Sequence, residues 1–213
     1  MTNINFIPKK DSRALYVVLS GISGGKDEPL VQYLSEAIKG TGSVLGMQFA
    51  NDPLYHDDAL PEMEEMTFDD CFDRLDAALE LAGGTEAYAN IIFITHSFSS
   101  VIATYYLGTH TRPSSLSPRY TLVVIDSDPS PKLLEYLNSL SREALGDKTQ
   151  NPFNASIIDY MRAHDSTEVL KALPVSVMTF DAEEIGADHE FTSDESKRLL
   201  AERLLSSLPA RTT

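Results

Sequence analysis

The chain has 213 residues, a length typical of a single domain with a buried core. Its 17 basic and 32 acidic residues give a formal net charge of −15, which argues against nucleic acid and anionic membranes as partners because both require a basic surface. The only cysteine, Cys71, excludes an internal disulfide and a cysteine-based metal site. No apolar run reaches the ~18–20 residues of a membrane span, and the first ten residues lack the apolar core of a signal peptide, so we expect a soluble cytoplasmic protein.

Apolar runs alternate along the chain with segments of helical period. The runs cover residues 14–19, 43–49, 90–94, 120–125 and 174–180. Strands that are apolar throughout and alternate with helices are typical of a parallel sheet covered on both faces. The sequence therefore predicts one α/β domain over residues 1–213, a three-layer sandwich with a mainly parallel sheet of about five to six strands and helices on both faces.

The longest stretch without a predicted strand is the segment 130–173. It carries short helical patterns separated by polar breaks, so we expect it to cover the sheet edge or to form a small cap.

Helix boundaries are indicated by caps and glycines. Thr67 and Asp70 form a capping-box pattern at the start of a predicted helix, and the pair 83–84, both glycine, marks its end. Thr192 and Glu195 form a similar pattern before the last predicted helix.

The most specific pattern lies in residues 90–103, where an apolar run breaks at a small polar pentapeptide and helix-compatible residues follow. A strand, a tight turn and a helix are predicted, with Ser97 at the apex of the turn. The pentapeptide Thr95-His96-Ser97-Phe98-Ser99 resembles the nucleophile elbow of the α/β-hydrolase family, whose usual flanking glycines are replaced here by Thr95 and Ser99. Ser99 is small enough for close packing of strand and helix, whereas the β-branched Thr95 fits less well. A serine in this position can also be a simple helix N-cap.

Glycines at 21, 24 and 25 let the loop after the first apolar run approach a substrate closely. Neither the Walker spacing nor the dinucleotide-binding fingerprint is met, which argues against a phosphate cradle. In an α/β hydrolase this loop and the residue after the nucleophile each supply one N–H group to the oxyanion hole. The resemblance thus implies that the N–H groups of Ile22 and Phe98 stabilise the oxyanion.

Residues 186–192, Gly-Ala-Asp-His-Glu-Phe-Thr, directly precede the last predicted helix and resemble the histidine loop of the family. The chain order of serine, acid and histidine is also that of the family. The resemblance therefore implies that His189 is the general base. The other histidines lie in polar loops, in the segment 130–173 or beside the serine: His56, His96, His110 and His164.

Several carboxylates are candidates for the triad acid. Asp128 is favoured because it closely follows the fourth apolar run and Pro129 fixes the loop, similar to the Asp-Pro that often ends the acid-bearing strand of the family. Asp126 is the close rival. If the last apolar run is the acid-bearing strand, the acid is instead Asp181 or Glu183. Each aspartate can also serve simply as a cap of a turn or helix.

The resemblance implies a serine hydrolase that cleaves a small-molecule carboxylic ester or thioester through an acyl-enzyme, a mechanism that needs neither a metal nor an organic cofactor. The alternative is a catalytically silent protein of the same fold that binds a ligand or a partner. A nucleotide-binding domain is the weakest alternative because no phosphate-binding motif is complete. Neither the acyl group, the leaving group nor the oligomeric state is indicated by the sequence.

Overall fold

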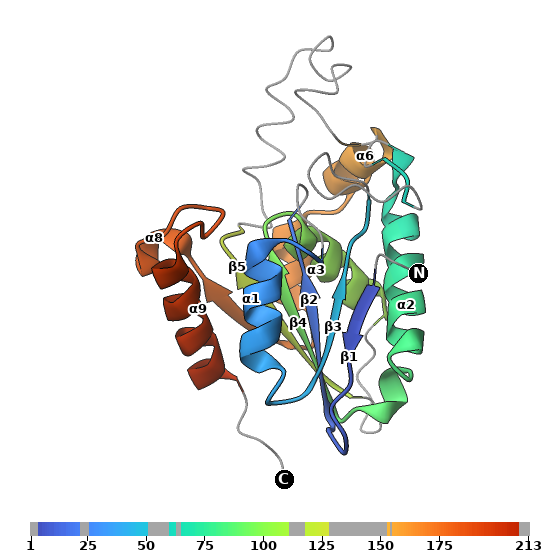
Figure 1. Cartoon of the computed structure of the whole chain (residues 1–213). Helices are drawn as coiled ribbons and strands as arrows, with labels where there is room; N and C mark the ends of the chain where they lie inside the picture. Colours follow the sequence, from blue (N-terminus) through green and yellow to red (C-terminus); the bar gives the residue numbers. More distant parts are fainter. Residues whose placement is uncertain are drawn as a thin grey trace.

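A single six-stranded sheet organises the computed structural model of the chain, which describes residues 4–21, 26–50, 60–62, 65–110, 118–127, 153 and 155–208. The strand order is β1-β3-β2-β4-β5-β6, and all neighbours run parallel except β1 and β3, which pair antiparallel (Figure 1). The strands are β1 (Ile4–Ile7), β2 (Ala14–Leu19), β3 (Ser43–Met47), β4 (Asn90–His96), β5 (Arg119–Ile125) and β6 (Ser176–Phe180).

Helices cover both faces of this sheet. On one face α1 (Pro29–Ile38), α8 (Ala182–Ile185) and α9 (Asp194–Ser207) share a buried apolar cluster with the strands. The opposite cluster is formed with α2 (Phe68–Leu81), α3 (Ser99–His110), α6 (Ala155–Ala163) and α7 (Ser166–Ala172). A short 3₁₀ helix, η2 (Thr85–Ala87), leads into β4. The chain is therefore the three-layer α/β sandwich that the sequence predicts.

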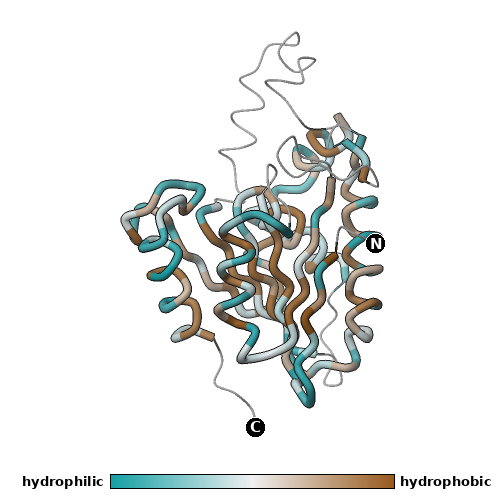
Figure 2. The backbone as a smooth tube through the Cα atoms, viewed as in Figure 1, coloured by the Kyte–Doolittle hydropathy of each residue, from teal (hydrophilic) through white to brown (hydrophobic). Residues whose placement is uncertain are grey.

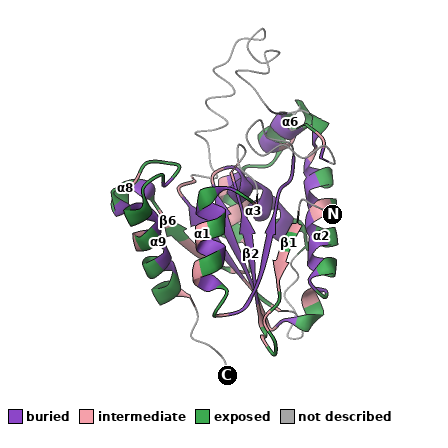
Figure 3. Cartoon of the chain, viewed as in Figure 1, coloured by how far each residue is buried: buried purple, intermediate pink, exposed green. Residues whose placement is uncertain are grey.

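The central strands are buried on both faces because successive side chains point to opposite sides of a sheet. In β2, Leu15, Val17 and Leu19 belong to one cluster, and Tyr16 and Val18 belong to the other. These strands form the hydrophobic centre of the molecule in Figure 2, and Figure 3 shows the same strands as buried. Parallel strands without a solvent-facing side read as continuous apolar runs, which is how the sequence indicated them.

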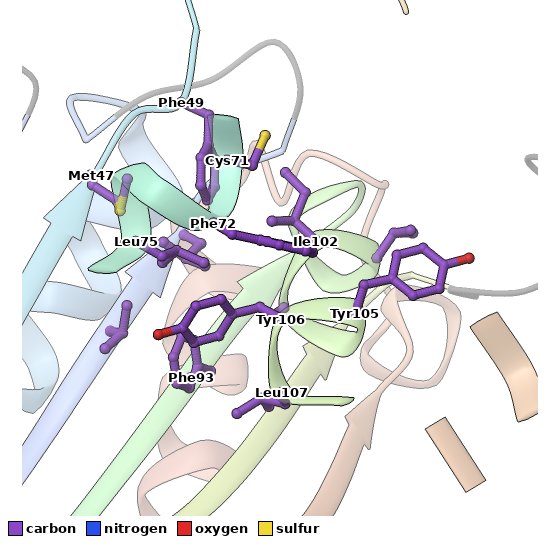
Figure 4. Packing of buried hydrophobic residues seen from close by; sticks show 14 of the residues in the cluster. Met47, Phe49, Cys71, Phe72, Leu75, Phe93, Ile102, Tyr105, Tyr106 and Leu107 are labelled. Atoms are coloured by element: carbon purple, nitrogen blue, oxygen red, sulfur yellow. The ribbon is translucent and has the colours of Figure 1, made fainter. Parts of the chain in front are cut away.

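Helix α3, which follows the Ser97 turn, is enclosed by its neighbours. All residues from Ser99 to Leu107 are buried. Figure 4 shows Ile102 and Tyr106 of α3 packed together with Phe72 of α2 and Phe93 of β4. A helix fixed on all sides holds the turn at its N-terminus in one position.

All five predicted strands are present, and the structure adds β1. This strand has only four residues, lies at the sheet edge and is partly exposed, so its periodicity is too short to be recognised. The capping box of Thr67 and Asp70 is confirmed. The last helix, however, is capped by Ser193, whose side chain accepts a hydrogen bond from the Ser196 N–H, and not by Thr192, whose hydroxyl donates instead to Asp188.

Helices α6 and α7 fall within the segment 130–173 and pack against the side of the sheet that carries α2 and α3. Residues 130–152 and 154 of this segment lie outside the described residues. Among the helices that the structure describes, none combines the length and apolarity needed to cross a bilayer.

Candidate active site

Ser97 occupies a sharp turn between the end of β4 and the start of α3. Its φ of 54° lies in the left-handed region, which costs a non-glycine residue about 1–2 kcal/mol. The Ser97 N–H donates to the carbonyl of Ile125 at the end of β5, at 3.2 Å, and so ties the turn to the neighbouring strand. Backbone strain of this kind is typical of a nucleophile elbow, where it lifts the serine out of the sheet.

The hydroxyl residues that replace the family's flanking glycines hold the turn together. The Thr95 hydroxyl donates to the Val123 carbonyl on β5 at 2.7 Å and lies 2.9 Å from the Ser100 hydroxyl. Ser99 Oγ accepts from the His96 N–H at 3.1 Å and lies within hydrogen-bond distance of the Leu19 carbonyl on β2. Thr95 therefore fits the turn better than its β-branched shape suggests, because its hydroxyl satisfies a buried strand carbonyl.

A chain of two hydrogen bonds runs from Ser97 to a carboxylate. The Nε2 atom of His189 lies 3.1 Å from Ser97 Oγ, and its Nδ1 atom lies 2.5 Å from Asp126 Oδ2. This arrangement sets the tautomer: Nδ1–H donates to Asp126, which leaves the Nε2 lone pair to accept from the Ser97 hydroxyl. The His189 side chain is 48% exposed, so the imidazole can exchange protons with a bound substrate.

Asp126 is the first residue after β5 and is held by two backbone hydrogen bonds in addition to its contact with His189. Its φ is 42°, so the backbone leaves the strand at once in the left-handed region. Its N–H donates to the Phe180 carbonyl at 2.7 Å, and its Oδ1 accepts from the Ala182 N–H at 2.9 Å. With Oδ1 bound to the start of α8, only Oδ2 faces His189. The carboxylate is therefore oriented by the backbone of the following strand and helix.

The loop that carries His189 is held by a hydrogen bond within the loop, by a buried side chain and by a hydrogen bond from His96. Asp188 accepts from the Thr192 N–H at 2.9 Å, and Phe191, with a φ of 49°, is only 1% exposed in the core beneath the loop. His96 Nε2 lies 2.8 Å from the carbonyl of His189, to which its N–H donates. The residue before the serine thus supports the backbone of the histidine.

One of the two N–H groups expected in the oxyanion hole can be located. Phe98 directly follows Ser97, and its N–H has no acceptor within the part of the chain that the structure describes, which leaves it available to a ligand. Ile22 lies outside the described residues. The preceding Gly21 approaches the serine closely, because a Cβ at this position would come within 3.2 Å of Ser97 Cβ. The centroids of the Phe98 and Phe153 rings lie 4.6 Å apart, and Phe153 belongs to the segment 130–173.

The carboxylate that accepts the hydrogen bond from His189 Nδ1 belongs to Asp126, the second candidate of the sequence analysis. Asp128, the favoured candidate, lies outside the described residues. Asp181 caps α8, accepting from the Glu183 N–H at 2.8 Å. Since a neutral imidazole has one Nδ1 hydrogen, and Asp126 accepts it here, Asp126 takes the position expected for Asp128.

The remaining histidines have other environments. The Nδ1 atoms of His110 and His164 lie 3.0 Å from the backbone carbonyls of Tyr106 and Tyr160, and His56 lies outside the described residues. His96 is 3% exposed, and this burial lowers its pKa, so the ring is neutral near pH 7. The sequence analysis, which placed His96 only beside the serine, gave no sign of this support of the His189 backbone.

Solved structures with the same fold are numerous, although no protein-family model and no curated protein sequence matches the chain. Est1E from Butyrivibrio proteoclasticus, with ferulic acid bound, has a TM-score of 0.67 at 11% identity over 96% of this chain and 94% of that one. Alpha/beta hydrolase domain-containing protein 10 from mouse has a TM-score of 0.62 at 11% identity over 97% and 94%. The esterase domain of a Rhodothermus marinus protein has a TM-score of 0.56 at 16% identity over 94% and 89%. Likeness at these identities concerns architecture alone, and with the sheet order and the Ser97 turn it establishes that the chain has the α/β-hydrolase fold.

Proposed function

We propose that the protein is a serine hydrolase that cleaves a carboxylic ester or thioester through an acyl-enzyme. The observation that carries the proposal is the hydrogen-bonded series Ser97–His189–Asp126, with the serine on a strained turn. This geometry provides a nucleophile, a base within reach of its proton and a carboxylate that orients the base.

In the proposed reaction Ser97 Oγ attacks the acyl carbonyl carbon while His189 Nε2 takes the hydroxyl proton. Asp126 stabilises the resulting imidazolium through Nδ1–H. The N–H groups of Phe98 and, as the resemblance implies, Ile22 stabilise the oxyanion. When the tetrahedral intermediate collapses, the leaving oxygen or sulfur takes the proton from Nε2. A water molecule then hydrolyses the acyl-enzyme by the same route.

The charge of the chain bears on the substrate class. A net charge of −15 repels polyanionic acyl carriers as they approach the site. Uncharged esters and thioesters meet no such barrier. Est1E, whose structure contains ferulic acid, is an architectural neighbour and lends support to an ester as the substrate. We therefore propose an uncharged ester or thioester in preference to a nucleotide-linked acyl group.

A fluorophosphonate probe tests the proposal directly, since it reacts with an activated serine and not with an ordinary one. Mass spectrometry of the digested protein should place the adduct on Ser97, and p-nitrophenyl acetate should be hydrolysed. Ser97→Ala should abolish both signals. The matched control is Ser206→Ala, an exposed serine on α9, which should label and turn over like the native protein.

Absence of labelling on the folded native protein would contradict the enzyme and support the silent binding protein of the same fold. Labelling at a serine other than Ser97 would contradict the assignment of the nucleophile.

A further inference from the structure

Behind the catalytic imidazole lies a second group of ionisable side chains. Glu28 occupies the N-cap position of α1, His96 ends β4, and Glu190 follows His189 in the histidine loop. One nitrogen or oxygen atom from each of the three lies within 4.8 Å of those from the other two. Three segments of the chain therefore bring an imidazole and two carboxylates together.

His96 is the central member of this group because its ring is 97% buried, with 3% exposed. Since Nε2–H donates to the His189 carbonyl at 2.8 Å, the Nδ1 atom carries a lone pair. This atom has no hydrogen-bond partner among the described residues, and Glu28 Oε1 lies 3.8 Å away, beyond hydrogen-bond distance. A buried acceptor thus faces a carboxylate, which is also an acceptor. The buried Nδ1 lone pair of His96 therefore calls for a cation or a donor beside it.

The arrangement has the features of a metal site. A metal-binding histidine usually donates its other ring N–H to a carbonyl or carboxylate, as His96 does to His189. A separation of 3.8 Å between Nδ1 and Oε1 allows one ion to contact both atoms at the usual ~2.1 Å. Gly21 lies beside Nδ1 and adds no side chain there, since a Cβ at this position would lie 3.5 Å from this atom.

We infer that Glu28, His96 and Glu190 bind a divalent first-row transition metal ion, with Zn²⁺ as the best match to one imidazole and two carboxylate ligands. Hard cations such as Mg²⁺ are poor matches, since they prefer oxygen ligands and retain water. Two of the ligands are the immediate neighbours of Ser97 and His189. The ion therefore joins the elbow to the histidine loop and limits their separation. This role is independent of the acyl-transfer chemistry proposed above.

Metal content gives the first test. The full-length protein is stripped with a chelator and dialysed to equilibrium against micromolar Zn²⁺, and bound zinc is measured by elemental mass spectrometry. We expect about one Zn²⁺ per chain, the stoichiometry of a single three-ligand site. Thermal unfolding should shift upward by roughly 5–10 °C at a free Zn²⁺ concentration of about 100 times Kd. An excess of Mg²⁺ should neither displace the zinc nor raise the midpoint.

Two variants remove a ligand without disturbing the surroundings. Glu190→Gln changes an exposed side chain, and His96→Gln keeps an N–H near the position of Nε2 while it removes Nδ1. Each should weaken Zn²⁺ binding by at least ~10–100-fold. The matched control is Glu184→Gln, an exposed carboxylate on α8, which should bind zinc like the native protein.

The site is distinguished from surface binding by His189→Gln, which removes the exposed imidazole beside Glu190 and should retain the zinc. Equal uptake by the native protein, Glu190→Gln and His96→Gln would overturn the inference, as would uptake far below one ion per chain. Loss of zinc in His189→Gln alone would assign the ion to the catalytic imidazole and would also overturn it.

Discussion

The two loops that meet at the site are held in different ways. In the elbow, residues 95, 96, 99 and 100 are at most 3% exposed, and the hydroxyls of Thr95 and Ser99 donate to carbonyls of the flanking strands. In the histidine loop, residues 188–190 are exposed, and Phe191 is the one fully buried side chain of residues 186–192.

Different parts of the structure therefore hold the Ser97 and His189 side chains in place. Ser97 is fixed by the sheet and by α3, which is buried on all sides. His189 depends on a few contacts that join residues distant in the sequence, notably those to Asp126 and His96. Segments with few buried contacts open at a lower free energy than the core. The histidine loop should therefore loosen under conditions in which the elbow stays intact.

Removal of either reacting group should have the largest effect. Ser97→Ala and His189→Ala should each lower kcat for p-nitrophenyl acetate by ~10⁵-fold or more, and the double variant should be little worse because the two groups act as one unit. Circular dichroism should show native folding in all three variants. If the effects of the two single changes multiplied in the double variant, the residues would not act together.

Loss of the acid should come next. Asp126→Asn should lower kcat by up to ~10⁴-fold, since the amide favours the wrong tautomer of His189. Asp181→Asn removes only a cap of the short helix α8 and should have little effect on the rate. Asp128→Asn provides the direct comparison, and we expect it to lower kcat less than Asp126→Asn does. A more severe loss in Asp128→Asn would return the role of acid to that residue.

Much of the architecture was predictable because it rests on local patterns. The five apolar runs mark strands buried on both faces, and the pentapeptide around Ser97 indicates the turn. His189 was predicted from its position before the last helix. The structure brings it within 3.1 Å of Ser97, although the two residues are 92 positions apart.

The choice between Asp126 and Asp128 depends on geometry that the sequence does not encode locally. Asp126 leaves β5 in the left-handed region and binds the backbone of Phe180 and Ala182, more than fifty residues further along the chain. Strand β6 must pair with β5 before these partners exist. A sequence pattern reports the end of a strand to within a residue or two and cannot give the φ of the next residue.

Phe191→Ala tests the single buried support of the histidine loop. Truncation of a buried phenylalanine costs about 3–5 kcal/mol, and here the cost should be at the lower end because a loop can collapse or open locally. We expect kcat to fall although the reacting groups are unchanged. Hydrogen exchange should be accelerated in residues 186–192 and unaltered in β4 and α3. Equal acceleration in both regions would contradict the independent opening of the loop.

Thr95→Val is the matched change in the elbow. It keeps the shape of the side chain and removes the hydroxyl that binds the Val123 carbonyl, at a cost of about 1–3 kcal/mol in the free energy of unfolding. The sheet and α3 should still hold the turn, so kcat should change less than in Phe191→Ala. Chemical denaturation and steady-state kinetics on the two variants measure the contrast.

The smallest effect on activity is expected from thiol reagents. Their only target is Cys71, which lies on the same side of the sheet as α3. Cys71 on α2 is fully buried in the cluster that also contains α3, and burial raises its pKa to about 12. Because the thiolate is the reactive form, the thiol should resist Ellman's reagent in the native protein at pH 8. Activity should therefore persist in the presence of the reagent, and labelling should require unfolding of the core.

In Phe191→Ala the labelling rate should rise no more than the global loss of stability requires, since opening of the histidine loop leaves α2 and α3 packed. Rapid labelling of Cys71 in that variant while its overall fold is retained would show that the elbow face opens together with the loop.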